Sequence, residues 1–128
     1  MAESDGRTVY TATIASSTDE SSAVALGADS VLAIEFQTGA NTFDATTAYV
    51  LFKASHDGST YNWIEDKDKT IWAVQVVATT NTTGWVYVPA EVFAGARFVK
   101  AYPCSDNTGT AVTQTAARTI KLICGKLV

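Results

Sequence analysis

The chain has 128 residues, of which 47% are hydrophobic and 17% charged, and its formal net charge is −4 at pH 7. This length is typical of one domain, and such a chain buries enough apolar surface to fold without a disulfide or a metal. The acidic balance, without a cluster of lysines and arginines, argues against nucleic-acid binding, and no apolar run is long enough to cross a bilayer. We therefore expect a single domain over residues 1–128, with residues 1–7 as a possible N-terminal arm, that binds neither nucleic acid nor membrane.

Short runs of alternating apolar and polar residues, rich in Thr, Val and aromatics, predict strands along most of the chain. In chain order, the expected strands span residues 8–14, 23–26, 31–37, 48–55, 61–64, 71–77, 85–88, 97–102 and 119–125. The Asp57-Gly58 pair marks a tight turn, and residues 89–95 are expected to form a short helical turn closed by Gly95. Eight or nine short strands at this spacing predict an all-β fold, an antiparallel β-sandwich of jelly-roll or immunoglobulin-like type.

Several expected strands are apolar on both faces, although a sandwich strand needs only one apolar face. In the fourth strand, Val50 and Phe52 share one side, while Tyr49 and Leu51 share the other. Either loops of the same chain cover the second face, or that face contacts another protein. The residues expected to make such contacts are Tyr49, Leu51, Trp72, Trp85 and Tyr87.

The aromatic residues also allow a second interpretation. Exposed rings could form a platform for a sugar, as in sandwich-shaped carbohydrate-binding modules, or the same rings could fill the core or an interface. The residues concerned are Tyr49, Tyr61, Trp63, Trp72, Trp85 and Tyr87. The sequence leaves both alternatives open.

Catalytic and metal-binding patterns are missing from the sequence. The one histidine, His56, lies in the turn sequence HDGST and is expected to face solvent rather than to activate a nucleophile. The acidic segments at residues 19–20 and 65–68 are expected to be solvated turns rather than calcium sites. We expect no catalytic residue, no metal, no cofactor and no enzymatic activity.

The two cysteines, Cys104 and Cys124, are expected to be free thiols. If the eighth and last strands form a hairpin, Cys124 lies opposite Phe98 and far from Cys104. Cys124 shares a strand face with Ile120 and Leu122, which predicts a thiol in the core.

The C-terminal third carries a more specific pattern. It contains Pro89, the stretch FAGARFVK at residues 93–100, a loop from Gly109 to Gln114, and AARTIKL at residues 116–122. Together with the strand, Asp-Gly turn and strand of residues 50–64, this pattern resembles a small β-rich family of bacteriophage virion proteins. The chain departs from the family pattern in its Trp-rich segment at residues 71–88 and in its last six residues, ICGKLV.

This resemblance implies a virion structural protein, made in the host cytoplasm and located in the virion. The expected role is a capsid decoration or cement protein that stabilises the head by binding the major capsid protein or other virion proteins. Such a protein is expected as a homo-oligomer or in many copies, so that modest single contacts suffice. The alternatives are a carbohydrate-binding module or a neck, tail or fibre component.

Overall fold

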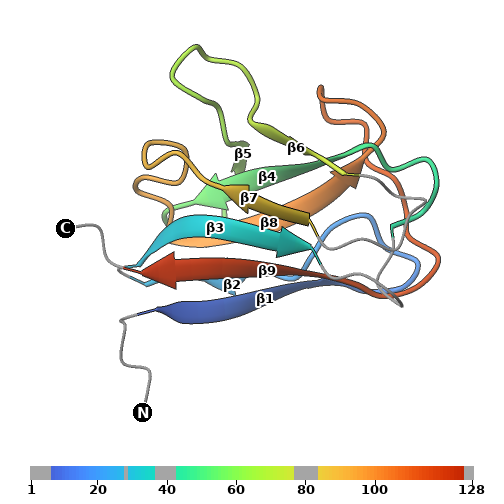
Figure 1. The fold of residues 1–128 in the computed structure, drawn as a ribbon, viewed down its shortest axis with the longest axis horizontal. Coiled ribbons are helices and arrows are strands. Elements are labelled where there is room, and N and C mark those ends of the chain that lie inside the picture. The colour runs from blue at the N-terminus through green and yellow to red at the C-terminus, as the bar shows by residue number, and fades with distance from the viewer. Residues whose placement is uncertain (1–6, 28, 37–42, 77–83, 126–128) are drawn as a thin grey trace.

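The computed structural model describes residues 7–27, 29–36, 43–76 and 84–125, and these residues form nine strands and no helix. The strands are β1 (Thr8–Ile14), β2 (Val24–Ala25), β3 (Ser30–Phe36), β4 (Tyr49–Ser55), β5 (Asn62–Trp63), β6 (Ala73–Gln75), β7 (Gly84–Tyr87), β8 (Phe98–Cys104) and β9 (Arg118–Gly125). Every strand pairing is antiparallel, and the strands form two sheets (Figure 1). The predicted all-β, antiparallel sandwich is confirmed. With no helix among the described residues, no candidate helical membrane span is found there.

The first sheet contains four strands in the order β1-β9-β3-β7, and Figure 1 shows β9 running between β1 and β3. The second sheet has the order β2-β8-β4-β5, and β6 also pairs with β4. Among the described residues of the first sheet, β7 pairs with β3 alone, which makes it an edge strand of that sheet. The expected helical turn at residues 89–95 is instead a succession of turns, although Gly95 has the positive φ of 82° expected of a closing glycine.

The main core lies between the two sheets. Its fully buried large side chains are Ile14, Leu26, Val31, Ile34, Val50, Phe52, Val99, Ile120 and Leu122. Phe93 reaches into this core from the turns after β7, and its ring makes edge contacts with Phe52 at 5.5 Å and Trp72 at 5.7 Å between centroids. The core therefore takes the inner faces of β1, β4, β8 and β9 with the period of two that the sequence predicts, whereas in β3 a register shift between Val31 and Ala33 breaks that period.

A second apolar cluster covers the outer face of the second sheet. Leu51 and Cys104 are fully buried in it and Tyr102 nearly so, with Tyr49 and Trp63 packed around them. The loop at residues 105–111 lies over this cluster, because a Cβ placed on Gly109 would lie 3.0 Å from the Trp63 ring. Loops of the same chain therefore cover this face, and Leu51 offers no surface to a partner, which differs from our expectation.

Both cysteines are free, as expected, and both are buried, although burial was expected only for Cys124. The hairpin on which we based that expectation is wrong, because β8 and β9 belong to different sheets. Cys124 lies in the main core, and Cys104 lies in the cluster on the outer face of the second sheet. Burial raises the pKa of Cys104 to about 11 and that of Cys124 to about 12.

A buried polar network joins the segments that precede β4 and β9. Gln114 is fully buried; its Oε1 accepts hydrogen bonds from the Asp44 N–H at 3.1 Å and from Arg118 Nε at 3.3 Å. Its Nε2 donates to Thr47 Oγ1 at 3.1 Å. Gln114 and Arg118 are both part of the C-terminal pattern noted in the sequence, and here they hold loops together.

Candidate functional site

The outer face of the first sheet carries the exposed apolar side chains. Among the described residues, the exposed large hydrophobic side chains are Val9 at 54%, Trp85 at 44% and Tyr87 at 79% of their full exposure. Trp85 and Tyr87 of β7 alternate with Val86 and with Val88, the residue after the strand, and both valines pack against the main core. Their two rings meet edge to face, with centroids 6.0 Å apart and an interplanar angle of 75°.

The strand register orders this face into two rows. One row contains Val9, Ile123, Ala33 and Tyr87, and the next contains Thr11, Lys121, Glu35 and Trp85. The surface is recessed in the middle of the first row, between Val9 and Tyr87, because Ala33 is small and both Ala33 and Ile123 are buried. The result is a groove of about 300 Å³ that Trp85, Tyr87 and Arg7 help to line. We call these two rows and the groove the aromatic face.

The other aromatic residues that could have formed a platform are engaged elsewhere. Trp72 packs on Phe52 and Phe93 at the edge of the main core. Trp63 makes an edge contact with Tyr102 at 5.1 Å between ring centroids, and Lys53 Nζ lies 4.6 Å from the Trp63 ring. Lys100 Nζ lies 4.7 Å from the ring of Tyr61.

Tyr49 belongs to the cluster on the outer face of the second sheet and is half-buried there. Of the five contact residues expected from the sequence, only Trp85 and Tyr87 lie together on an exposed surface. These two residues also remain as the exposed part of the aromatic set considered for a sugar platform.

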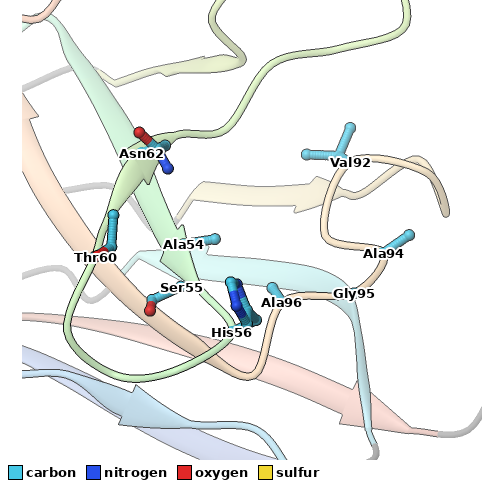
Figure 2. Close-up of a pocket in the computed structure, with 9 residues that line it drawn as sticks. All are labelled: Ala54, Ser55, His56, Thr60, Asn62, Val92, Ala94, Gly95 and Ala96. Atoms are coloured by element: carbon cyan, nitrogen blue, oxygen red, sulfur yellow. The ribbon is translucent and has the colours of Figure 1, made fainter.

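A polar pocket of about 220 Å³ lies at the end of the sandwich where β4 and β7 finish. Figure 2 shows Thr60 and Asn62 along one side of it, Val92 and Ala94 along the other, and His56 between them. His56 faces solvent in its turn, as expected. This pocket could not be predicted from the sequence, because its two walls come from segments that are distant in the chain.

The turn that carries His56 is held by its own side chains. Asp57 Oδ1 accepts hydrogen bonds from the N–H groups of Ser59 at 2.8 Å and Thr60 at 3.0 Å, and from Ser55 Oγ at 2.8 Å. Hydrogen bonds from Thr60, Ser59 and Ser55 hold the pKa of Asp57 well below its usual range. The Asp57 carboxylate is therefore ionised at neutral pH and able to accept these hydrogen bonds.

Within the described residues, no group of three or more His, Cys, Asp or Glu side chains could hold a metal ion. The acidic segment at residues 65–68 forms a turn in which Asp66 Oδ1 accepts hydrogen bonds from the N–H groups of Asp68 at 2.8 Å and Thr70 at 3.1 Å. This is the local turn expected from the sequence.

The fold defines the chain as a β-sandwich domain, and comparisons with known proteins agree on that class. No protein-family model matches the chain, and no curated protein matches its sequence. Among solved structures, the C-terminal domain of a chitobiase from Bacteroides fragilis is similar, with a TM-score of 0.50 and 19% identity. That match covers 85% of this chain but only 64% of the chitobiase domain. At this identity the likeness establishes the fold alone.

Two further solved structures are similar at a lower level. One is a CBM32 module of AlyQ in complex with 4,5-unsaturated mannuronic acid, with 12% identity, a TM-score of 0.45, and 94% of this chain and 78% of that chain covered. The other is a CBM32 module of a family 31 glycoside hydrolase from Clostridium perfringens, with 9% identity, a TM-score of 0.45, and 93% and 76% covered.

Proposed function

We propose that this domain is a non-catalytic carbohydrate-binding module and that the aromatic face is its binding surface. The observation that carries the proposal is the exposed pair of Trp85 and Tyr87 beside an open groove. An exposed ring face packs against the apolar C–H face of a sugar, and an edge-to-face neighbour holds that ring in place. A chain that folds around two well-filled apolar clusters has no structural need to leave these rings in water.

The surroundings of the rings favour a sugar over a purely apolar partner. Lys121 and Glu35 lie in the same row as Trp85, so charged hydrogen-bonding groups flank the ring. Ala33 and Ile123, in the row of Tyr87, are already buried within the domain and add little apolar area. Aromatic packing combined with a few polar groups is typical of small-molecule sites, and a groove of about 300 Å³ has room for a short sugar segment.

A glycan array tests this proposal. The wild-type domain should bind a restricted set of glycans, and a variant with both Trp85→Ala and Tyr87→Ala should lose that binding while keeping its circular dichroism spectrum. Tyr61→Ala removes an aromatic ring outside the aromatic face and is the matched control. Binding that survives the double substitution, or an array on which the wild type binds nothing, would contradict the proposal.

A capsid decoration or cement protein is the second candidate, and the resemblance of residues 89–122 to bacteriophage virion proteins favours it. Gln114 and Arg118, which carry part of that resemblance, lie in the buried network, so the shared pattern supports a shared fold more directly than a shared contact surface. Here the aromatic face would bind the major capsid protein or another virion protein. A domain on the virion surface that binds a glycan would satisfy both candidates.

The number of copies per particle tests the second candidate. Hundreds of copies would support a role on the capsid surface, and a dozen or fewer would support a neck, tail or fibre location. A domain that does not co-purify with particles or empty heads in fixed stoichiometry would rule the virion role out.

A further inference from the structure

The polar pocket holds three side chains that can bind a ligand. Within the described part of the chain, the His56 ring, the Thr60 hydroxyl and the Asn62 carboxamide donate or accept no hydrogen bond. All three residues are exposed, and all three line the same pocket of about 220 Å³ (Figure 2). Each of these groups both donates and accepts hydrogen bonds when the imidazole is neutral.

The opposite wall of the pocket is apolar and fixed. Val92 is buried, and the neighbouring Phe93 anchors this wall through its ring contact with Phe52 in the main core. The Arg97 N–H donates a hydrogen bond of 3.1 Å to the Ser55 carbonyl, which ties this wall to the turn that carries His56. Because both walls are anchored, the pocket exists before any ligand arrives, and binding costs little ordering of the protein.

The lack of charged side chains around the pocket indicates the chemical class of its ligand. None of the described residues that line the pocket is Asp, Glu, Lys or Arg. An ionic ligand would therefore find no opposite charge in it, whereas sugar hydroxyls match groups that donate and accept in the same place. The pocket is smaller than the groove of the aromatic face, and its lining includes short side chains such as Ala94 and Ala96.

We propose that this pocket binds a single neutral sugar unit. His56, Thr60 and Asn62 exchange hydrogen bonds with its hydroxyls, and its apolar face packs against Val92. The inference rests on the proposed function for its ligand class, but not for its site, since no residue is shared between the pocket and the aromatic face. The domain would then have two separate sugar sites.

Nuclear magnetic resonance can test the pocket directly, because His56 is the one histidine of the chain and its imidazole signals report on this pocket alone. The probes are the methyl glycosides of glucose, galactose, mannose, N-acetylglucosamine and N-acetylgalactosamine, each titrated into the full chain at neutral pH. At least one of them should shift the His56 signals with a dissociation constant on the order of 1 mM, as expected for a ligand with few contacts.

Two alanines in the same turn give a matched pair of variants. Ala94 lines the pocket and Ala90 does not, although both are exposed. Ala94→Phe should weaken binding of the active glycoside by about tenfold or more, whereas Ala90→Phe should leave it unchanged. Asn62→Leu should weaken it as well, because it removes a hydrogen-bonding group without opening the pocket.

The outcomes separate this inference from the proposed function. If the sugars shift only the Trp85 indole signal, the proposed sugar site in the pocket is contradicted and the proposed binding surface on the aromatic face is supported. If the shifts are confined to the His56 signals, sugar binding in the pocket is supported and sugar binding on the aromatic face is contradicted. If no glycoside of the panel shifts the His56 signals, or if Ala94→Phe binds as the wild type does, the pocket does not bind a sugar.

Discussion

The guanidinium of Arg118 lies 2.6 Å from the carboxylate of Asp44, and both side chains are largely withdrawn from solvent. Burial alone would raise the pKa of Asp44, but hydrogen bonds from Arg118 and Thr115 outweigh it and hold the pKa below its usual value. The ion pair joins the segment before β4 to the start of β9. Gln114 strengthens this connection, because its Oε1 accepts hydrogen bonds from both Asp44 and Arg118, and together they hold one end of the sandwich.

Removing one partner of this pair should be costly. Arg118→Met removes the cationic partner of the Asp44 carboxylate and one of the two donors to Gln114 Oε1, and we expect a loss of about 3 kcal/mol in the free energy of unfolding. Lys100→Met breaks the partly exposed ion pair with Glu20 and should cost less than about 1 kcal/mol. Urea unfolding at pH 7 measures both, and equal losses would contradict the structural role of the buried pair.

The loop over the second sheet gives a second prediction. Gly109 has a φ of 112°, and an added Cβ would lie 3.0 Å from the Trp63 ring, whereas Gly27 has a φ of 62° and open space around it. Gly27→Ala should therefore cost about 1 kcal/mol from backbone strain, and Gly109→Ala more than about 2 kcal/mol from strain and displacement of the loop. If thermal or urea unfolding finds the two variants alike, the loop does not pack on Trp63 as described.

Alkaline pH should destabilise the domain through its buried thiols. In the folded chain the pKa of Cys104 is about 11 and that of Cys124 about 12. The unfolded thiols lose their protons first as pH rises above about 8.5, so the unfolded state then binds fewer protons than the folded state and stability falls. The free energy of unfolding should decline from pH 8.5 to 11, and the decline should be shallower when both cysteines are replaced by alanine.

Thiol labelling is an independent test of the burial of the two cysteines. At pH 8 a thiol reagent should modify neither Cys104 nor Cys124 in the folded domain, because buried and protonated thiols react slowly. Both should react in denaturant. Rapid labelling of the folded domain would mean that one of the two apolar clusters opens readily.

The sequence predicted the strands and, for most of them, the side on which each residue lies, because the alternation of strand residues is a local property. In β3 the expected shared face of Leu32 and Ile34 is wrong, because a register shift between Val31 and Ala33 places Val31 in the main core with Ile34. Val50 and Phe52 face the main core, and Tyr49 and Leu51 face away from it, as expected. Which outward face is left open could not be predicted, since it depends on where the loop at residues 105–111 folds back. The pairing of β8 and β9 was wrong for the same reason: the choice of sheet depends on contacts between distant segments.

The candidate site was predictable only in part. Trp85 and Tyr87 were named from their place on a strand with two apolar faces, and they do form the exposed pair. Trp72 has the same sequence signature but packs against Phe93, which lies in a turn that no periodicity connects to it. The polar pocket was missed because His56 and Val92 meet only in the folded chain.

The central claim is that Trp85 and Tyr87 bind a carbohydrate, and calorimetry with the glycan that binds best on the array tests it most directly. Trp85→Ala should weaken that binding by more than about tenfold, because a packed aromatic ring contributes more than about 1.4 kcal/mol, while Tyr61→Ala should leave it unchanged. Both variants should unfold in single transitions like the wild type. Equal affinity of the Trp85→Ala variant and the wild type would contradict the claim.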